Sequence, residues 1–500
     1  MLEQYCLLTM SQGRQATADI MKLFGIAETC SESATLLIQH KLVIQAAVEV
    51  VVTECCLVQE GSVIKQQAST AVDSVHSPFG FDHGVRLNTF KLLAKLTGTQ
   101  PTPWGILKGV RPTKIAHRLL DEGHNEADIL RVFQDCYGVR QPKAELVAEI
   151  VRRQRPILAT NHQQKISVYV GIPFCLSRCF YCSFPGMALP QQSAVDDFLV
   201  ALHRDIQDAA QSIVSHGLTI ENIYIGGGTP TSLSTRDLEQ VFIWIEQYLL
   251  RANTTELTVE AGRPDSLNRD KIRLLRQHNV TRVSVNPQSM QQKTLKLIGR
   301  NHTVQAIIDI FMEFRAVTDC LINMDVIAGL PGETLADMAD TLDQIRQLSP
   351  DNLTVHTLSV KRGSNLQTQL QSDPLFGLED LPDSAVVTSM VNNAAEVAAL
   401  MNMQPYYLYR QKNMVGNLEN VGYAKPNRLC RYNIQMMEER QTVIGIGPGA
   451  TTKAVVNATH RLKSCYHAKD VACYQKDLDR HLAKRRTLLD SLYAGTLFIE

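Results

Sequence analysis

Residues 169–184 read YVGIPFCLSRCFYCSF, and Cys175, Cys179 and Cys182 in this stretch are separated by four and then three positions. The alternating apolar run that precedes them, residues 166–172, is typical of a β-strand. The loop that leaves such a strand can fold around one metal centre. Three thiolates leave one position open for another ligand, either on a zinc ion or on one iron of a [4Fe-4S] cube. The stretch therefore predicts a metal site at the end of a strand.

This spacing, with the aromatic Tyr181 directly before the third cysteine, resembles the CxxxCxφC signature of radical S-adenosylmethionine (SAM) enzymes. The alternatives are three structural cysteines that lie close together, or a zinc site whose fourth ligand lies elsewhere. We favour the cluster because cysteine is uncommon and the triplet follows a strand, where strand-helix barrels carry their catalytic groups. The signature implies a [4Fe-4S] cluster and SAM as cofactors, and it names no substrate.

Composition narrows the class of protein. The 500 residues include 50 basic and 50 acidic side chains, so no global field favours a nucleic acid or an anionic membrane as a partner. The 12 cysteines are scattered along the chain, which fits a reducing compartment. The first residues lack a basic region, and the most apolar early run, residues 42–58, is interrupted by polar side chains. We expect a soluble, cytoplasmic monomer.

Three domains are expected from the order of the patterns. Residues 1–160 predict an N-terminal α+β domain of unknown role, and the polar linker 160–165 marks its end. Residues 161–374 predict the catalytic domain, and residues 375–500 a mostly helical C-terminal extension that covers the substrate. Helical spacing outside the catalytic domain predicts helices at 17–24, 87–96, 127–137, 144–153 and 478–489.

The catalytic domain repeats strand and helix. After the strand at 166–172, further strands are predicted at 222–225, 257–260, 282–285, 324–327 and 353–356. Helices are predicted between them, among them 196–214, 269–277 and 304–314. Six strand-helix units indicate an α/β fold with a parallel, incompletely closed (β/α)6 barrel.

Polar and glycine residues follow several of these strands. The run GGGTPT at 226–231 exposes backbone groups that suit the close approach of a polar ligand. The ends of the later strands carry Glu260, Gln288, Asp325 and Ser359. Any one of them alone would more often be a capping or loop residue. Their shared location favours a role in the site for the first three.

Further motifs make the resemblance specific. Tyr-x-x-Ile-Pro-Phe-Cys, the glycine run, VNPQSM at 285–290 and DVIAGLPGET at 325–334 together resemble the oxygen-independent coproporphyrinogen III oxidase family. Residues 109–123, GVRPTKIAHRLLDEG, and 406–413, YYLYRQKN, resemble its HemZ-type branch, the coproporphyrinogen dehydrogenases with an extra N-terminal domain. The resemblance covers about residues 85–455.

The resemblance implies a role for each matching residue. Cys175, Cys179 and Cys182 would hold the cluster, and Tyr169 and Tyr181 would flank the bound SAM. The remaining SAM contacts would come from Gly227, Gly228 and Thr229 at its amino group, Glu260 and Arg300 at its charged ends, Gln288 and Asp325 at its ribose, and Ser359. An ammonium needs a carbonyl or carboxylate, and a carboxylate needs a guanidinium. Tyr169, Gln288 and Arg300 are also expected to act in catalysis.

The resemblance also implies the reaction. An electron delivered through the cluster would cleave SAM to methionine and a 5′-deoxyadenosyl radical, which abstracts hydrogen from the β-carbon of a propionate. Loss of carbon dioxide and one more electron leaves a vinyl group. Two propionates of coproporphyrinogen III would react to give protoporphyrinogen IX. A protein such as flavodoxin or ferredoxin is expected to donate the electron.

Aromatic and cationic side chains gather in the C-terminal region. A flat tetrapyrrole with four carboxylates suits aromatic faces and cations, so we interpret these residues as a substrate-covering set. The alternative is an ordinary solvated surface. The set comprises Tyr406, Tyr407, Tyr409, Arg410, Lys412, Lys425, Arg428, Arg431 and Lys453.

Two departures from the family pattern leave another function open. Phe184 stands where classical members have a fourth cysteine, and Gly171 stands where they have a histidine. The related haem-chaperone branch also lacks the fourth cysteine, so a haem-binding chaperone is the alternative. That branch carries His-Asn-x-x-Tyr-Trp, whereas this chain begins the matching stretch with Tyr432 and lacks the histidine that could ligate haem iron. A radical SAM enzyme on another substrate is the third hypothesis.

Overall fold

The structure is a computed structural model, and it forms two compact units. One unit comprises Met1–Ala148 with Gly416–Leu418, and the other comprises Glu149–Val415 with Glu419–Glu500. Helix α5 (Gln141–Leu158) begins in the first and ends in the second. The structure describes residues 4–7, 13–28, 36–45, 48–59, 62–72, 80–184, 186–361, 364, 366, 368 and 381–498.

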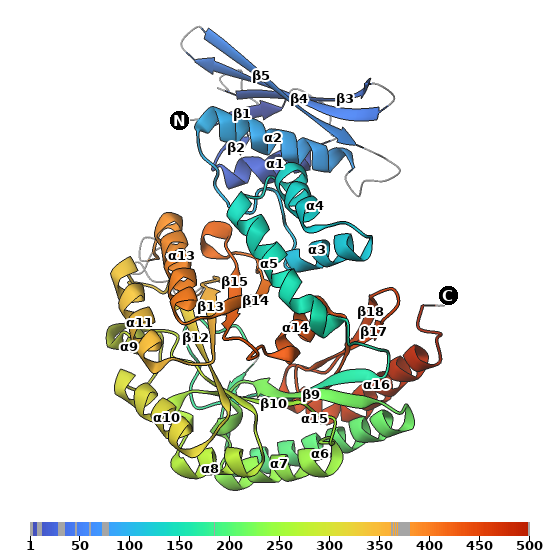
Figure 1. Ribbon diagram of the computed structural model, residues 1–500, viewed down its shortest axis with the longest axis vertical. Helices are drawn as coiled ribbons and strands as arrows, with labels where there is room; N and C mark the ends of the chain where they lie inside the picture. The colour runs from blue at the N-terminus through green and yellow to red at the C-terminus, as the bar shows by residue number, and fades with distance from the viewer. Residues whose placement is uncertain are drawn as a thin grey trace. The chain divides into compact units, whose positions relative to one another are not determined.

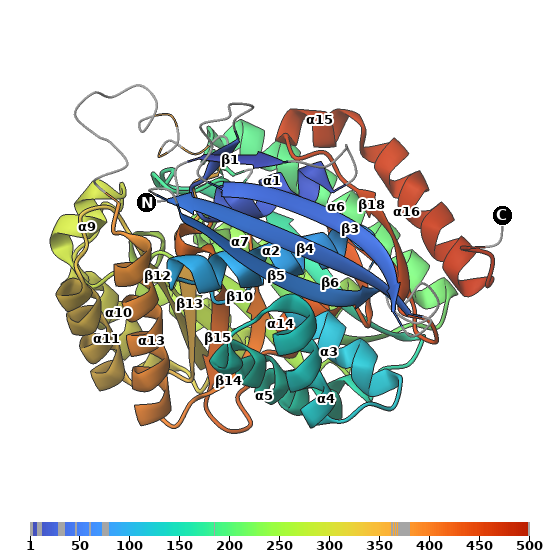
Figure 2. The same ribbon diagram turned by 90° about the horizontal axis from the view of Figure 1, so that it is seen from above.

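The first unit contains a five-stranded sheet in the order β2-β1-β3-β4-β5. The strands are β1 (Gln4–Leu7), β2 (Ala27–Glu28), β3 (Leu36–Gln45), β4 (Val48–Gln59) and β5 (Ser62–Val72). Helices α1 (Arg14–Leu23) and α2 (Phe81–Thr97) cover one face of it, as Figures 1 and 2 show. The core joins Ile20 of α1 and Phe90 of α2 to Ile38 of β3. The predicted helices at 17–24 and 87–96 overlap α1 and α2.

Helices α3 (Pro112–Asp121) and α4 (Glu126–Arg131) complete the first unit, and a π-helical turn (Val132–Cys136) continues α4. Pro112 opens α3 at a position where no backbone donor is needed, and Asn125 caps α4 with a capping box. The helix predicted at 127–137 is therefore α4 together with this turn. The helix predicted at 144–153 lies inside α5.

The second unit is built on an 11-stranded sheet in the order β14-β15-β13-β12-β11-β10-β9-β6-β16-β17-β18. The six neighbours from β13 to β6 are parallel, which confirms the predicted α/β barrel strands. Each extends beyond its predicted range except β11. They are β6 (Lys165–Ile172), β9 (Thr219–Gly227), β10 (Glu256–Gly262), β11 (Arg282–Val285), β12 (Leu321–Ala328) and β13 (Asn352–Thr357).

Helices cover the outside of the parallel strands (Figure 1). Along β6, the alternate residues Val168, Val170 and Ile172 share one face of the strand and are all fully buried. The surrounding helices are α6 (Gln192–Ser215), α7 (Thr235–Tyr248), α8 (Arg269–Gln277), α9 (Gln292–Leu297), α10 (Val304–Val317), α11 (Leu335–Leu348) and α13 (Ser384–Leu400). The helix predicted at 269–277 has the bounds of α8.

The C-terminal region extends the sheet on both sides. Strands β14 (Gln404–Tyr409) and β15 (Asn420–Ala424) continue beyond β13, while β16 (Thr442–Ile446) pairs parallel with β6. Strands β17 (Thr451–Val456) and β18 (Arg461–Tyr466) follow antiparallel. Its further helices are α14 (Arg431–Glu438), α15 (Val471–Lys476) and α16 (Leu478–Tyr493), and the last contains the helix predicted at 478–489.

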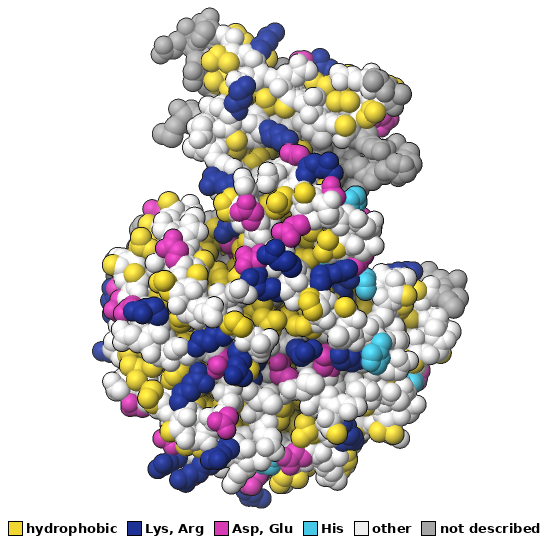
Figure 3. Space-filling model, in the orientation of Figure 1, with side chains coloured by type: hydrophobic (Ala, Val, Ile, Leu, Met, Phe, Trp, Pro, Cys, Tyr) yellow, Lys and Arg dark blue, Asp and Glu magenta, His cyan; other side chains and the backbone are white. Residues whose placement is uncertain are grey.

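The surface carries both signs of charge. Over the face of the second unit drawn in Figure 3, Lys and Arg side chains are interspersed with Asp and Glu, in agreement with the formal net charge of zero. No helix among the described residues has both the length and the apolar character needed to span a membrane.

Candidate active site

The cysteine loop lies between β6 and α6. Its base is closed by a short parallel ladder of β7 (Phe174–Cys175) and β8 (Met187–Ala188), in which the Leu189 N–H donates to the Cys175 carbonyl at 2.8 Å. Inside the loop, the Cys182 N–H donates to the Cys179 carbonyl at 3.1 Å. All three cysteines line one cavity of about 150 Å³, which we call the cysteine cavity.

The cysteine cavity brings together most of the predicted site residues, which reach it from the ends of β6, β9, β10 and β11 and from the segment after α9. The predicted residues that line it are Cys175, Cys179, Cys182, Tyr181, Gly227, Gly228, Thr229, Glu260, Gln288 and Arg300.

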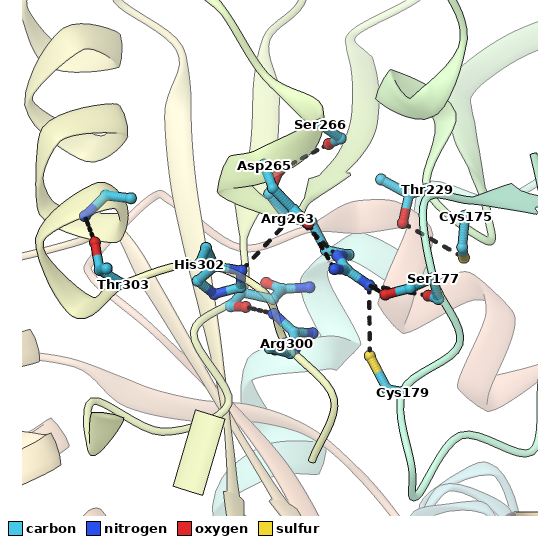
Figure 4. Close-up of polar contacts among 12 residues, drawn as sticks. Cys175, Ser177, Cys179, Thr229, Arg263, Asp265, Ser266, Arg300, His302 and Thr303 are labelled. Atoms are coloured by element: carbon cyan, nitrogen blue, oxygen red, sulfur yellow. Dashed lines mark hydrogen bonds and ion pairs between the residues drawn. The ribbon is translucent and has the colours of Figure 1, made fainter. Parts of the chain in front are cut away.

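The glycine run after β9 packs directly against the strand that carries the first cysteine. The Gly228 N–H donates to the Ile172 carbonyl at 2.8 Å, and the Thr229 N–H donates to the Phe174 carbonyl at 2.7 Å. A Cβ on Gly228 would lie 2.5 Å from the Phe174 oxygen and 2.9 Å from the Cys175 sulfur. Glycine is required here by this close approach. The Thr229 hydroxyl donates to the Cys175 sulfur at 3.6 Å (Figure 4).

Glu260 at the end of β10 is a carboxyl group on the cavity wall. Its Oε1 accepts from the Tyr224 hydroxyl at 2.6 Å, and its Oε2 accepts from the Gly227 N–H at 3.1 Å. Burial raises the pKa of Glu260 to about 7, and these two hydrogen bonds keep it from rising further. A cation that enters the cavity beside Glu260 would favour its charged form.

Gln288 has a left-handed backbone conformation, with φ of 67°. Its N–H donates to the Asp325 carbonyl and its carbonyl accepts from the Ile327 N–H, both at 2.9 Å. Non-glycine residues in this region cost about 1–3 kcal/mol and gather at functional sites. The strained backbone places Gln288 at the cavity wall between β11 and β12.

Several buried polar atoms at the cavity lack a hydrogen-bond partner among the described residues. They are Gln288 Oε1, Asn286 Oδ1 and Arg300 Nε. Arg300 is only 5% exposed, and its other nitrogens donate to the Asn286 carbonyl at 2.5 Å and the Tyr181 hydroxyl at 3.3 Å. Unsatisfied buried groups of this kind indicate a missing polar ligand.

Three predicted residues do not line the cysteine cavity. Tyr169 stacks at 6.3 Å on both Tyr224 and Tyr432. Asp325 accepts from the Asn323 amide at 2.7 Å, and its Oδ2 lies 3.6 Å from Nε2 of His356. Ser359 donates to the Lys412 carbonyl at 2.8 Å and lines a neighbouring cavity instead.

That neighbour, which we call the second cavity, has a volume of about 380 Å³. It shares Tyr181, Cys182, Phe184 and Gln288 with the cysteine cavity. Phe184, the residue in place of a fourth cysteine, is therefore part of the wall common to both. The other lining residues are Ser183, Ile327, His356, Thr357, Leu358, Ser359, Lys361, Tyr409, Gln411 and Asn420.

The second cavity combines an aromatic and two basic side chains. The Tyr409 hydroxyl and Nδ1 of His356 form a hydrogen bond at 3.3 Å. Burial lowers the pKa of Lys361, whose Nζ has no hydrogen-bond or ion-pair partner within the part of the chain that the structure describes. A half-buried ammonium without a partner suits an anionic group of a ligand.

Most of the predicted C-terminal set lies elsewhere. Tyr409 lines the second cavity, whereas Tyr406 and Tyr407 are buried in a hydrophobic cluster. Two of the cations pair with buried carboxylates: Lys453 with Glu439 at 2.7 Å and Arg431 with Glu221 at 3.1 Å. Lys425 donates to the Ser349 carbonyl at 3.0 Å. The expected boundary between residues 374 and 375 lies outside the described residues.

One arginine in the wall of the cysteine cavity was not among the predicted site residues. Arg263, one residue after β10, lines the cysteine cavity and is only 3% exposed. The run EAGRPD at 260–265 was a signal, because a charged residue so close to a strand end with a site carboxylate is unusual for a core. Its partner Asp265 lies in the same run, but Ser177, and His302 beside Asp265, could not be found from spacing, because they come from two other segments (Figure 4).

The lining fits the two cofactors implied by the sequence. In a [4Fe-4S] cluster each protein thiolate binds a different iron, so three thiols around a cavity suit it. No three His, Cys, Asp or Glu side chains within the described ranges are grouped to hold a single ion. The exposed glycine backbone, Glu260, Arg300 and the unpartnered Gln288 oxygen provide acceptors and donors for the charged and polar groups of SAM.

Comparisons with known proteins agree with this chemistry. A family model for the Radical SAM superfamily matches residues 169–345. Members of this superfamily use a [4Fe-4S] cluster and SAM. The chain is also similar to the solved structure of coproporphyrinogen III oxidase (HemN) from Escherichia coli, with a TM-score of 0.52 and 20% identity, over 65% of this chain and 72% of that one. This likeness concerns the fold.

Two curated relatives differ in what their names say. The heme chaperone HemW of Escherichia coli (strain K12) is 27% identical over 290 residues, which cover 58% of this chain and 70% of that protein. The oxygen-independent coproporphyrinogen-III oxidase-like protein HemZ of Bacillus subtilis (strain 168) is 37% identical over 397 residues, which cover 79% of this chain and 78% of that protein. The chain therefore belongs to the radical SAM superfamily and, within it, to the family of the oxygen-independent coproporphyrinogen-III oxidase-like protein HemZ.

Proposed function

We propose that this protein oxidatively decarboxylates two propionate side chains of coproporphyrinogen III to vinyl groups, without oxygen, and so forms protoporphyrinogen IX. At each propionate one hydrogen atom leaves the β-carbon, the carboxylate leaves as carbon dioxide, and one electron passes to an acceptor. The remaining carbons form the double bond. When bound, the cluster and SAM together supply a 5′-deoxyadenosyl radical that can take the hydrogen atom.

The observation that carries this proposal is the wall shared by the two cavities. Cys182 and Gln288 line both, so a molecule in the second cavity would lie beside the place where the radical is formed. The second cavity offers Tyr409 to a pyrrole face and Lys361 and His356 to a carboxylate. This is the chemistry of a tetrapyrrole that bears propionates.

The chain's own residues have separable tasks in this proposal. Glu260 and the Gly227 to Thr229 backbone hold the ammonium of SAM, and Arg300 holds its carboxylate. Gln288, fixed by its strained backbone, orients the ribose. Tyr181 and Phe184 separate the two cavities and exclude water from the reacting carbon. Lys361 holds a propionate carboxylate in place.

The names of the relatives support the same reaction. The HemZ relative is described as like an oxygen-independent coproporphyrinogen-III oxidase and aligns over most of both chains. The E. coli structure with the same fold is described as coproporphyrinogen III oxidase. A substrate of this class is therefore the first to test.

The test is an anaerobic assay of the cluster-reconstituted protein with SAM, a reductant and coproporphyrinogen III. Chromatography would follow 5′-deoxyadenosine and the porphyrin products together. Protoporphyrinogen from the wild type and not from Cys179→Ala is the expected result. Deoxyadenosine without any change in the porphyrinogen would contradict the substrate while leaving the radical chemistry standing.

A haem chaperone is the second candidate, because HemW proteins are among the relatives and Phe184 replaces the fourth cysteine. The position at which that branch carries a histidine is Tyr432, which is 4% exposed and stacks on Tyr224 at 4.4 Å. A phenol enclosed in this way is a poor haem ligand. Stable stoichiometric binding of haem by the purified protein, without turnover of porphyrinogen, would favour the chaperone over the oxidase.

A further inference from the structure

Arg263 makes two sets of contacts at opposite ends of its guanidinium. Its Nη1 donates to the Ser177 carbonyl at 2.9 Å and to the Ser177 hydroxyl at 2.8 Å, and it lies 4.0 Å from the Cys179 sulfur. Its Nε and Nη2 donate to the two carboxylate oxygens of Asp265 at 2.9 and 2.6 Å. Figure 4 shows the side chain extending from the Asp265 side toward the cysteine loop.

Further contacts hold the ion pair of Arg263 and Asp265 in place. His302 is buried, and its Nδ1 lies 3.7 Å from Oδ1 of Asp265. Although burial raises the pKa of Asp265, His302 and Arg263 together hold it well below its usual range. The backbone around Arg263 is also fixed, because its carbonyl accepts from the Ser266 hydroxyl at 2.7 Å. The guanidinium is therefore held in one orientation by a forked carboxylate.

We propose that Arg263 is a positioning residue for the iron-sulfur cluster: it fixes the cysteine loop at Ser177 and directs a positive charge and a hydrogen bond at the thiolate of Cys179, and thereby raises the potential of the cluster's one-electron reduction. This role belongs to the cofactor and does not depend on the substrate. Failure of the porphyrinogen assay would leave it unchanged.

The physical reason is the charge that reduction adds. One electron from an external reductant makes the cluster and its three thiolates more negative, and no bond to Arg263 forms or breaks. Hydrogen bonds to cluster sulfurs and nearby charge both change the potential of such a centre. Arg263 is almost fully buried, so water screens its charge less than that of an exposed residue. Asp265 offsets part of this charge from the far side.

The test is a redox titration of the cluster in the reconstituted full-length protein, followed by electron paramagnetic resonance without SAM or substrate. Arg263→Gln is expected to make reduction about tenfold less favourable, a fall of about 59 mV in the midpoint potential. Asp265→Asn is expected to shift the potential upward, because it removes a negative charge while Arg263 keeps its contacts with Ser177. A merely structural role would move both variants in the same direction.

Arg178→Gln is the matched control, because Arg178 adjoins Cys179 in the same loop but is exposed. Its shift should be less than half that of Arg263→Gln. Equal shifts, an unchanged potential in Arg263→Gln, or downward shifts in both Arg263→Gln and Asp265→Asn would overturn the proposal. Iron and sulfide content would be measured in every variant. If Arg263→Gln holds no cluster, Arg263→Lys replaces it in the titration. A midpoint potential that differs from the wild type by less than a threefold change in the reduction equilibrium would support the charge effect. A larger difference would contradict it.

Discussion

The cysteine cavity and the second cavity share a wall, but the chain builds them differently. The first is lined by loops that follow neighbouring parallel strands, so its residues converge by topology. The second adds Tyr409 and Asn420 from the antiparallel strands β14 and β15, far along the chain. The cysteine cavity contains three cysteines and a glycine run, residue types that indicate a particular cofactor. The second cavity is lined mostly by side chains that occur in many kinds of site. The type of reaction can thus be inferred from one cavity, while the substrate depends on the other.

The largest expected effect is on cluster binding, and it should be seen when a cysteine of the cysteine cavity is replaced but not when a cysteine elsewhere is replaced. Cys182→Ala should reduce bound iron and SAM cleavage at least about 100-fold, because loss of a ligand costs more than loss of a supporting contact. Cys473→Ala is the control, since Cys473 is exposed and lines neither cavity. Iron analysis and deoxyadenosine assay measure both. A full cluster in Cys182→Ala would contradict its role as a ligand.

The next effect tests the glycine contact of the cysteine cavity. Gly228→Ala forces a Cβ to within 2.5 Å of the Phe174 oxygen, so we expect a loss of about 1–3 kcal/mol of unfolding free energy and less bound iron. Gly186→Ala is the control, because its Cβ would approach the Pro173 oxygen only to 3.2 Å. Denaturant unfolding compares them. Equal stability of the two variants would contradict the close packing of Gly228 against Phe174.

A third prediction addresses the second cavity alone. Lys361→Met should raise KM for coproporphyrinogen III about 10- to 100-fold, because a hydrogen bond to a charged group contributes about 1.5–3 kcal/mol. Cluster content should stay at the wild-type level. Lys412→Met provides the control, since Lys412 is exposed and does not line the cavity. Equal KM values in both variants would remove Lys361 from the binding site.

The smallest effect concerns pH. Burial raises the pKa of Glu260 to about 7. Below that pH the carboxyl group must lose its proton before it can form an ion pair with a bound ammonium. The affinity for SAM should therefore rise about tenfold from pH 6 to pH 8, as Glu260 becomes charged. Calorimetric titration measures this rise, and Glu260→Gln should flatten it. A wild-type affinity that does not change with pH would exclude an ion pair at Glu260.

Most of the parallel strands could be predicted because they are short, mainly apolar runs that end in, or directly precede, glycine or a polar residue. The predicted range of β11 is the observed one, and the cavity at the ends of β6, β9, β10 and β11 follows from their common direction. Tyr169, on β6 itself, is one of the three predicted residues that do not line this cavity, since it stacks on Tyr224 and Tyr432. Spacing along a strand specifies the face of a residue but not which aromatic rings will pack there.

The contacts that decide charge were less accessible to prediction. Arg263 meets Ser177 across 86 positions of the sequence, and Arg431 meets Glu221 across 210. Whether a cation such as Lys361 stays without an ion-pair partner among the described residues or, like Arg431, pairs with a carboxylate depends on such distant partners. Residue type and local pattern contain no information on these pairings. The sequence therefore showed that the C-terminal region is rich in aromatic and cationic residues, but not which of them line a cavity.

The position of β16 has a consequence for how the protein is made. Strand β6, which leads into the cysteine loop, lies between β9 and β16, and β16 is fixed by Arg485 of α16 through the Gly445 carbonyl at 3.0 Å. During synthesis β6 leaves the ribosome on the order of tens of seconds before its second neighbour exists. Its edge must stay unpaired or shielded during that interval. The strand that leads into the cysteine loop therefore gains its second neighbour only after Thr442–Ile446 has been made.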